Sequence, residues 1–258
     1  MVTERRRIYI IEPRLSEKKN ESIDEVALDE PVCIFVNREH YVTLIATPEM
    51  KRELAVGHLL SEGILCSLDD LASVEIRSYD VLVETRKKVD FRVATDDMVT
   101  QIVKAYRVSP RMKGKSHHIS RVESELRVKV ATLMAAISEL NKKSSVHLKT
   151  RGTHAAMLCS MEGEPLSFAE DVGRHNAVDK VVGDYFLRGG DLGNCILLST
   201  GRQSGEMVQK AAMVGIPIVC SMAVPLVSGL RLAEATGVSL ASLSSGMLKL
   251  YTYSERIV

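Results

Sequence analysis

The second half of the chain alternates short apolar segments with amphipathic ones, and this alternation restricts the possible folds more than any other feature. Apolar runs too short for helices predict strands at 155–159, 195–198, 216–220, 238–243 and 248–253. Segments with apolar residues at helical spacing predict helices at 177–182, 206–214 and 226–235. Strands and helices that alternate through short connections are typical of an α/β layer fold with a partly parallel sheet.

The first half reads as a smaller unit that is rich in strands. Alternating apolar residues predict four strands, near 31–36, near 41–46 and two within 72–95. Thr47 as the cap and Pro48 in the first helical position predict a helix that ends at Gly63.

A basic segment joins the two halves. Residues 98–122 contain six Lys or Arg and no acidic residue. Its part at 108–120 contains Pro, Gly, Ser and two His, which predicts a basic mobile loop that is either solvated or docks an acidic partner. Apolar spacing then predicts a helix over 122–140. We therefore expect an N-terminal α+β subdomain at 1–120 and an α/β domain at 121–258.

Composition excludes several classes of function. Of the 258 residues, 45% are hydrophobic, which indicates a folded core, but only 4% are aromatic and the net charge is +1. Stacking platforms for bases and a field that attracts nucleic acid are therefore not expected. No apolar run reaches the length of a membrane span. The five cysteines are scattered, without a disulfide framework or a zinc-binding Cys-x-x-Cys, so we expect a cytoplasmic protein with reduced thiols and no metal site.

Three polar clusters stand at the ends of predicted strands, where sheets of this class bind ligands. They are the residues 150–154, 170–176 and 199–206. In the first cluster, His154 is either part of this site or a satisfied core histidine.

The third cluster follows a buried strand and precedes a helix. Gly201 and Gly205 allow the backbone to approach an anion at the start of that helix, and Arg202 can pair with a phosphate. The alternative is a capped turn in which Ser204 is the N-cap. The segment is not a P-loop, because the Gly-Lys-Ser/Thr sequence is missing.

The second cluster concentrates polar side chains at the start of a predicted helix. Asp171, Arg174, His175 and Asn176 lie within six residues. His175 and Asp179 are four residues apart, so on a helix the carboxylate can fix the tautomer of the imidazole. The alternative is a solvated helix start with a salt bridge.

Together these segments resemble the FdhD/NarQ family over residues 21–253. The most specific match is the run Glu170-Asp171-Val172-Gly173-Arg174-His175-Asn176-Ala177-Val178-Asp179-Lys180. The segments 199–202 and 208–217 are similar to the Ser-x-Gly-Arg turn of the family and to the helix and turn that follow it. The N-terminal motif of the family resembles the run Gly57-His58-Leu59-Leu60-Ser61-Glu62-Gly63-Ile64.

The resemblance implies a cytidine deaminase-like three-layer α/β/α core with a smaller N-terminal β-rich subdomain, assembled as a homodimer. It implies an accessory protein required for formate dehydrogenase activity. In such proteins sulfur passes from a cysteine desulfurase, through a persulfide on a Cys-x-x-Cys loop, to the bis-molybdopterin guanine dinucleotide cofactor of molybdenum or tungsten. A mobile thiolate of low pKa suits this chemistry. GDP, which corresponds to the nucleotide part of this cofactor, is a second expected ligand.

The resemblance and the three clusters together indicate which residues bind the cofactor. The turn between the last two predicted strands belongs to this set by resemblance alone. The expected residues are Thr150, Gly152, His154, Asp171, Gly173, Arg174, His175, Asn176, Ser199, Gly201, Arg202, Ser242, Leu243, Ser244, Ser245, Gly246 and Met247.

The sequence departs from the family pattern in its loops. The segment 108–120, where the Cys-x-x-Cys is expected, contains no cysteine, and the turn 242–247 lacks the expected Arg. Arg151 replaces a Gly of the family's Thr-Gly-Gly-x-His pattern and can supply a positive contact. Cys66 is then the best candidate for an exposed reactive thiol, although the acidic residues 69–70 disfavour its thiolate.

Other functions stay open beside sulfur transfer. The protein can be a chaperone for the cofactor or for a guanine nucleotide without sulfurtransferase activity, or a scaffold for formate dehydrogenase or a partner enzyme. A zinc hydrolase of the deaminase class needs a His-x-Glu and a Pro-Cys-x-x-Cys. Here His154 is followed by Ala155 and Ala156, and no Pro-Cys-x-x-Cys occurs, which argues against that class.

Overall fold

The larger part of the molecule is built on a six-stranded mixed sheet. The computed structural model describes residues 2–12, 16–87 and 119–258. The sheet has the strand order β12-β11-β10-β9-β7-β8. Its central strands β9, β10 and β11 are parallel, and β7, β8 and β12 are antiparallel to their neighbours. The strands are β7 (His154–Cys159), β8 (Pro165–Asp171), β9 (Ile196–Ser199), β10 (Ile218–Ser221), β11 (Ser239–Ser244) and β12 (Met247–Thr252).

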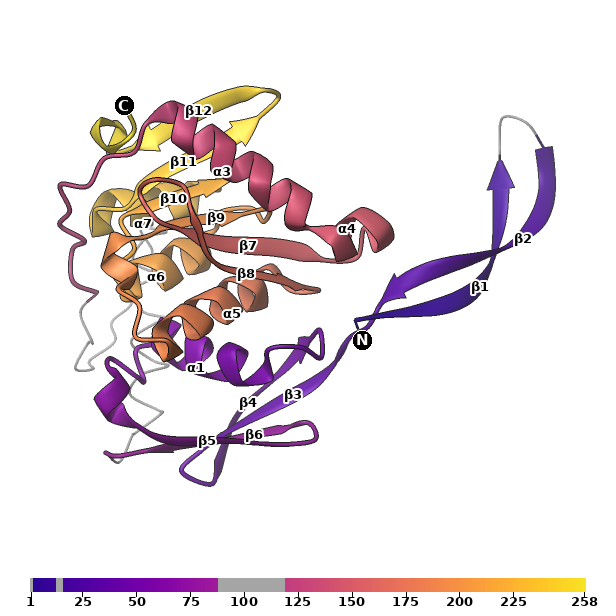
Figure 1. The fold of residues 1–258 in the computed structure, drawn as a ribbon, viewed down its shortest axis with the longest axis horizontal. Helices are drawn as coiled ribbons and strands as arrows, with labels where there is room; N and C mark the ends of the chain where they lie inside the picture. Colours follow the sequence, from indigo (N-terminus) through magenta and orange to yellow (C-terminus); the bar gives the residue numbers. More distant parts are fainter. Residues whose placement is uncertain (1, 13–15, 88–118) are drawn as a thin grey trace.

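Helices cover both faces of this sheet (Figure 1). On one face lie α5 (Arg174–Leu187), α6 (Gly205–Met213) and α7 (Val227–Thr236), and on the other lies α3 (Val130–Lys143), followed by the short α4 (Ser145–Thr150).

Alternating strand residues account for this layering, because successive side chains of a strand point to opposite faces. Leu158 and Leu197 pack in the cluster that includes α5 and α6, whereas Met157 and Leu198 pack in the cluster that includes α3. The predicted α/β layer fold is thus confirmed, and the narrower comparison with cytidine deaminases stays a prediction.

The N-terminal unit is a four-stranded sheet with one helix. The sheet has the order β4-β3-β6-β5, and α1 (Lys51–Ser61) lies between it and α5 (Figure 1). Its strands are β3 (Glu30–Val36), β4 (Glu39–Ala46), β5 (Leu71–Arg77) and β6 (Asp80–Thr85).

Two glycines allow α1 and α5 to cross in close contact. A Cβ atom on Gly57 would lie 1.8 Å from the carbonyl oxygen of Asp179, and one on Gly183 would lie 1.9 Å from that of Glu53. No side chain fits at such distances, so the two helices pack backbone to backbone. One hydrophobic core runs from the N-terminal sheet through this crossing to the large sheet.

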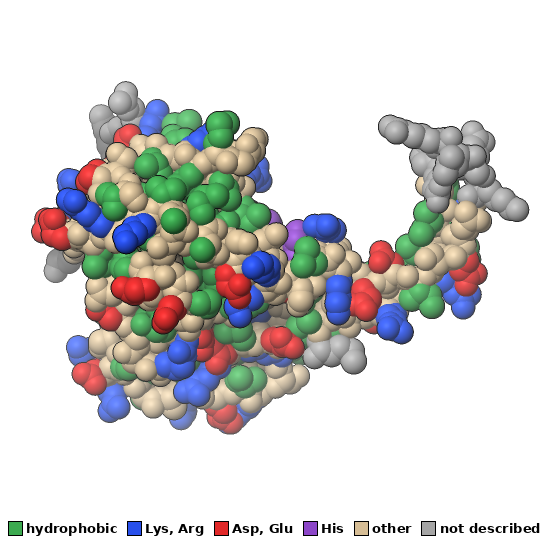
Figure 2. Space-filling model, turned by 45° about the horizontal axis from the view of Figure 1, so that its top comes forward, with side chains coloured by type: hydrophobic (Ala, Val, Ile, Leu, Met, Phe, Trp, Pro, Cys, Tyr) green, Lys and Arg blue, Asp and Glu red, His purple; other side chains and the backbone are tan. Residues whose placement is uncertain are grey.

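An N-terminal ribbon that the sequence did not predict extends from the body. The strands β1 (Thr3–Glu12) and β2 (Ser16–Ala27) pair with each other in a separate two-stranded sheet. Figure 2 shows this arm standing clear of the rest of the molecule, with apolar side chains along it. Among them, Tyr9 is 62% and Ile23 is 71% exposed.

The structure corrects the predicted start of one helix. The helix expected from residue 122 begins only at Val130. The preceding strap is held by partners elsewhere in the chain: the Val122 N–H donates to the Thr236 carbonyl at 2.7 Å, and Val128 forms a β-bridge with Ile257. These tertiary contacts bury Val122 and Val128 although the strap is not helical.

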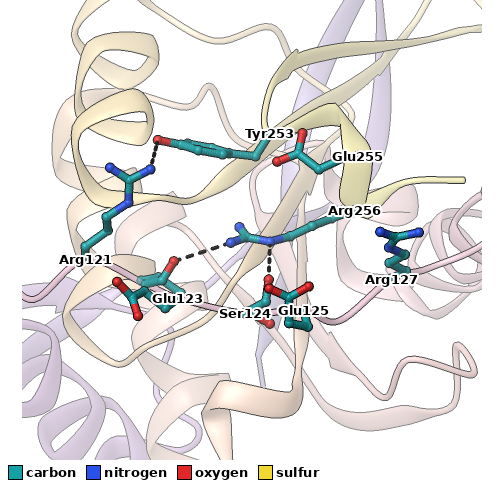
Figure 3. A pocket seen from close by; sticks show the side chains of 9 residues that line it. Arg121, Glu123, Ser124, Glu125, Arg127, Tyr253, Glu255 and Arg256 are labelled. Carbon is teal, nitrogen blue, oxygen red and sulfur yellow. Dashed lines mark hydrogen bonds between the residues drawn. The ribbon is translucent and has the colours of Figure 1, made fainter.

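A pocket of about 290 Å³ lies between this strap and the C-terminal turn (Figure 3). Arg256 Nε donates to the Ser124 carbonyl at 3.0 Å, and Arg121 Nη2 donates to the Tyr253 hydroxyl at 3.2 Å. The polar groups here hold the strap against the sheet, at the edge opposite to the predicted ligand site.

The start of α1 is a second correction. The helix begins at Lys51 after Met50 in a left-handed conformation, so Thr47 is not its cap. Strand β8, the short helix α4 and the arm were not predicted, whereas the other strands and α-helices of the second half were. The strand residues expected beyond 87 and the loop 108–118 lie outside the described residues, and the boundary near 120 stays a prediction. Among the described residues we find no helix with the length and apolar composition of a membrane span.

Candidate functional site

The three polar clusters meet along one edge of the large sheet. In the strand register, His154 lies opposite Asp171, and Ser199 lies between Ala156 and Ser221. Ser221 in turn lies opposite Ser242. The carboxyl ends of β8, β9, β10 and β11 and the start of β7 therefore share this edge, which we call the strand-end edge. It is the place where α/β sheets bind ligands.

His154 is joined to the third cluster through Thr200. Its Nδ1 lies 3.2 Å from the Thr200 hydroxyl, which also accepts a hydrogen bond from the Ala155 N–H at 3.0 Å. Burial lowers the pKa of His154, and the charges of Arg174, His147 and Arg202 lower it further. The imidazole is therefore neutral at pH 7 in a cationic setting that favours an anionic ligand.

Arg174 is the first residue of α5 and packs on the turn after β9. A Cβ atom on Gly201 would lie 2.8 Å from Arg174 Cβ, so only glycine allows this contact. Arg174 Nε is buried and has no hydrogen-bond partner among the described residues. A buried guanidinium donor without an acceptor is costly, and a phosphate or carboxylate would satisfy it.

The start of α6 differs from the predicted capped turn. Ser204 occupies the N-cap position, but its hydroxyl makes no capping bond and has no partner in the described part of the chain. Ser228 Oγ accepts the Gly205 N–H at 3.1 Å instead. The Ser204 hydroxyl is thus a buried donor at the N-terminus of α6, without a hydrogen bond to any described residue.

The first cluster is shaped by the end of α4. The Thr150 hydroxyl donates to the Val146 carbonyl at 2.9 Å and accepts the Gly152 N–H at 3.0 Å. Arg151 takes a left-handed backbone conformation with a φ of 55°. Gly152 packs against Ala27 of the arm, since a Cβ atom there would lie 3.2 Å from that side chain.

Asp171 and Asn176 are bonded within the protein. Asp171 is fully buried, and its carboxylate lies 2.6 Å from Lys180 Nζ and accepts the Thr47 N–H and hydroxyl at 3.1 and 3.0 Å. Asn176 Nδ2 donates to Asp171 at 2.9 Å and to the Ile45 carbonyl at 2.8 Å. The two side chains tie the strand-end edge to the N-terminal unit, and their contact with a cofactor stays a prediction.

The expected pairing of His175 with Asp179 is wrong. Asp179 Oδ2 lies 3.1 Å from His58 Nδ1, and Lys210 Nζ donates to both of its carboxylate oxygens at 2.9 Å. His175 Nε2 instead lies 3.3 Å from a carboxylate oxygen of Glu206, without hydrogen-bond geometry. The sequence did not point to His58 and Lys210 as partners, because they come from distant segments of the chain.

The turn 242–247 lies at the same edge but carries no charge. Ser242 is buried, with its hydroxyl 3.4 Å from that of Tyr251. Ser245 and Gly246 form the turn with φ angles of 53° and 74°, and Met247 is 58% exposed. This part of the edge offers hydroxyl and apolar contacts.

Cys66 lies far from this edge. It follows α1 at the end opposite to Thr47, and a helix of 11 residues spans about 16 Å. It lines a cavity with Met213 and Gly215, at the other edge of the large sheet. Burial raises the pKa of its thiol, and the charge of Asp70 raises it further.

The other four cysteines are no better candidates for a reactive thiol. Burial raises the pKa of Cys159, Cys195 and Cys220 to about 12. Cys33 is half-buried in β3 and lies 3.5 Å from the Thr43 hydroxyl. Cys220 directly precedes Ser221 in β10, but its side chain is buried in the cluster that includes α3, so no cysteine is exposed at the strand-end edge.

Comparison with known proteins identifies relatives over nearly the whole chain. A model of the FdhD/NarQ family matches residues 27–258. Sulfur carrier protein FdhD of Thermoplasma acidophilum is 31% identical over 255 residues, which cover 92% of this chain and 88% of the relative. The Saccharolobus solfataricus protein of the same name is 31% identical over 258 residues, which cover 98% of each chain.

A solved structure has the same fold. It comes from Desulfotalea psychrophila and is described as that of a proposed formate dehydrogenase accessory protein. It superposes with a TM-score of 0.80 at 23% identity and covers 100% of both chains. The family model and these sequence relatives show that the chain belongs to the FdhD/NarQ family.

Proposed function

We propose that the protein is a formate dehydrogenase accessory factor that binds the bis-molybdopterin guanine dinucleotide cofactor at the strand-end edge. The observation that carries this proposal is the pair of buried donors without partners in the described structure, Arg174 Nε and Ser204 Oγ. They lie beside the N-termini of α5 and α6, whose free N–H groups favour phosphates. The relatives named as sulfur carriers support the link to this cofactor.

Calorimetric titration with GDP tests this site. We expect binding by the wild-type protein and an affinity about 10- to 100-fold lower for Arg174→Ala or Arg202→Ala, because a hydrogen bond to a charged group contributes roughly 1.5–3 kcal/mol. Arg38→Ala, on the exposed β3–β4 turn, is the matched control and should bind like the wild type. No binding at millimolar GDP, or equal affinities for all four proteins, would remove the proposal.

Sulfur transfer is the finer part of the proposal. Membership of a family of sulfur carriers favours delivery of sulfur from a cysteine desulfurase to the cofactor before its insertion into formate dehydrogenase. A chaperone without sulfurtransferase activity is the second candidate, because no cysteine is exposed at the strand-end edge. Maturation of formate dehydrogenase in the cytoplasm, with and without an active desulfurase, separates the two.

The arm favours assembly with a second copy of the chain. A two-stranded ribbon by itself is only marginally stable in water, and Tyr9 and Ile23 of this arm are largely exposed. Its Arg7 and Glu21 side chains, with nitrogen and oxygen 3.2 Å apart, give it charges of both signs that can pair with a symmetric copy.

Light scattering after size exclusion tests this assembly. We expect a dimer for the wild type and a monomer for the double variant Tyr9→Ser and Ile23→Ser. A monomeric wild-type protein, or a dimer that the variant leaves intact, would contradict the role of the arm.

A further inference from the structure

A second cavity, of about 290 Å³, lies between α1, α5 and α6. Among the residues that line it are His58 of α1 and Glu62 directly after it, His175 and Asp179 of α5, and Gln209 and Lys210 of α6. His154 and Arg202 are not among its lining residues, so it is distinct from most of the strand-end edge. His175, at the start of α5, connects the two.

Asp179 fixes the orientation of His58 in this cavity. Burial alone would raise the pKa of Asp179, but the charge of Lys210 and the contact with His58 lower it to about 2. The carboxylate is therefore ionised at pH 7 and accepts a hydrogen bond from the N–H group at His58 Nδ1, with the two heavy atoms 3.1 Å apart. In neutral His58 the lone pair then lies on Nε2.

Two polar atoms in the cavity wall make no hydrogen bond within the described structure, although one of them, His175 Nε2, lies 3.3 Å from a carboxylate oxygen of Glu206. Gln209 is 2% exposed, and its side-chain oxygen is buried without a hydrogen bond. His175 Nε2 is buried in the same way. Buried polar atoms are nearly always paired, so their presence around one cavity indicates a polar guest.

The shifted pKa values of His175 and Glu62, which line the cavity, also favour acid–base chemistry there. Burial lowers the pKa of His175 to about 4, and the charges of Lys210 and Arg174 add to this effect. Burial raises the pKa of Glu62, although Lys210 opposes the shift. Carboxyl and imidazole groups with pKa values displaced in opposite directions are typical of sites where protons move.

We propose that this cavity is an acid–base site in which His58 Nε2 takes the proton of a thiol or hydropersulfide that enters from outside the chain. The inference rests on the proposed sulfur-handling function. The thiol comes from outside because no cysteine of this chain lines the cavity. In general, the pKa values of an imidazole and a thiol differ by only about 2 units, so the equilibrium for proton transfer from thiol to imidazole is only moderately unfavourable. An alcohol is a much weaker acid and does not give up its proton to an imidazole.

The step is a single proton transfer. The S–H bond of the guest breaks, an N–H bond forms at His58 Nε2, and the electron pair stays on sulfur, so nothing is oxidised or reduced. The products are a thiolate and an imidazolium that Asp179 stabilises. Lys210, whose Nζ lies 2.9 Å from Asp179, supplies a second positive charge that stabilises the thiolate. The carboxyl groups of Glu62 and Glu206, which also line the cavity, disfavour the thiolate.

Nitrogen NMR of protein labelled with ¹⁵N-histidine tests the proposal. The probe is 2-mercaptoethanol, and the matched control is ethylene glycol, which differs only in oxygen for sulfur. At neutral pH we expect the thiol, and not the diol, to shift one histidine Nε2 resonance from the lone-pair form to the N–H form. His58→Gln, whose amide can still donate to Asp179, should remove that resonance and leave the fold and GDP affinity intact.

An unchanged spectrum with the thiol, or equal shifts with thiol and diol, would overturn the proposal. A shift that persists in His58→Gln would overturn the assignment to His58. The outcome is separate from that of the GDP titration, because loss of nucleotide binding by Arg174→Ala depends on the strand-end edge alone.

Discussion

The strand-end edge and the cavity between α1, α5 and α6 are neighbouring regions with opposite character. The edge is cationic, with Arg174 and Arg202 around a neutral His154, and its residues stand in short runs of sequence. The cavity contains the carboxylates of Asp179 and Glu62 and is assembled from helices far apart in the chain. The fold thus places a cationic edge and a cavity with two carboxylates side by side within one sheet-and-helix layer.

The largest expected effect on the free energy of unfolding comes from the buried ion pair between Asp171 and Lys180, which joins the two regions to the N-terminal unit. Asp171→Ala leaves Lys180 buried without its carboxylate, which should lower the free energy of unfolding by about 3–5 kcal/mol. Denaturant unfolding measures this change. Asp184→Ala, which breaks a more exposed pair with Arg188, is the control and should cost only about 1 kcal/mol. Equal losses would contradict the structural role given to Asp171.

An intermediate effect is expected from His175, which belongs to both regions. Its pKa is lowered to about 4, so between pH 6.5 and 4 the unfolded chain binds a proton that the folded protein does not. The free energy of unfolding therefore falls as the pH decreases through this window, by roughly 2 kcal/mol down to pH 4.5.

His175→Gln should remove that part of the pH dependence. Denaturant unfolding of both proteins at pH 7.5 and 4.5 gives the comparison. A variant with the same loss of stability as the wild type on acidification would show that His175 is not held neutral by its surroundings.

The smallest effect is expected from Cys66, which lies far from the strand-end edge. Because its thiol has a raised pKa and faces another cavity, Cys66→Ser should change the maturation of formate dehydrogenase less than about twofold. Mass spectrometry after incubation with a cysteine desulfurase and cysteine should find no added sulfur on Cys66. A sulfur adduct there, with loss of maturation in the variant, would instead make Cys66 the carrier.

The sequence was sufficient for five of the six strands of the large sheet and for the position of the strand-end edge, because these patterns are local. Apolar strands such as Ile196–Ser199 and the glycine-bearing turn after it are visible as short patterns. Parallel strands then place their carboxyl ends at one edge, so Ser199 and Ser221 meet without further information.

The cavity and the arm depended on tertiary contacts that no local pattern records. His175 and Asp179 have the spacing of a helical pair, yet Lys210 and His58 reach the carboxylate from other helices and displace that pairing. Charged residues such as Arg5 and Glu25 stand in runs of charged residues within the arm, which hides its strands from a search for buried segments. For the strap before Val130 the sequence predicted a helix that the structure does not have. Val122 and Val128 are buried there by contacts with other parts of the chain.

A crystal structure of the protein with GDP tests the central claim most directly. The account predicts the diphosphate at the strand-end edge, within hydrogen-bond distance of Arg174 Nε and Ser204 Oγ, with Gly201 beside it. Nucleotide bound elsewhere, for example in the pocket beside Arg256, with both donors still unpaired, would contradict it.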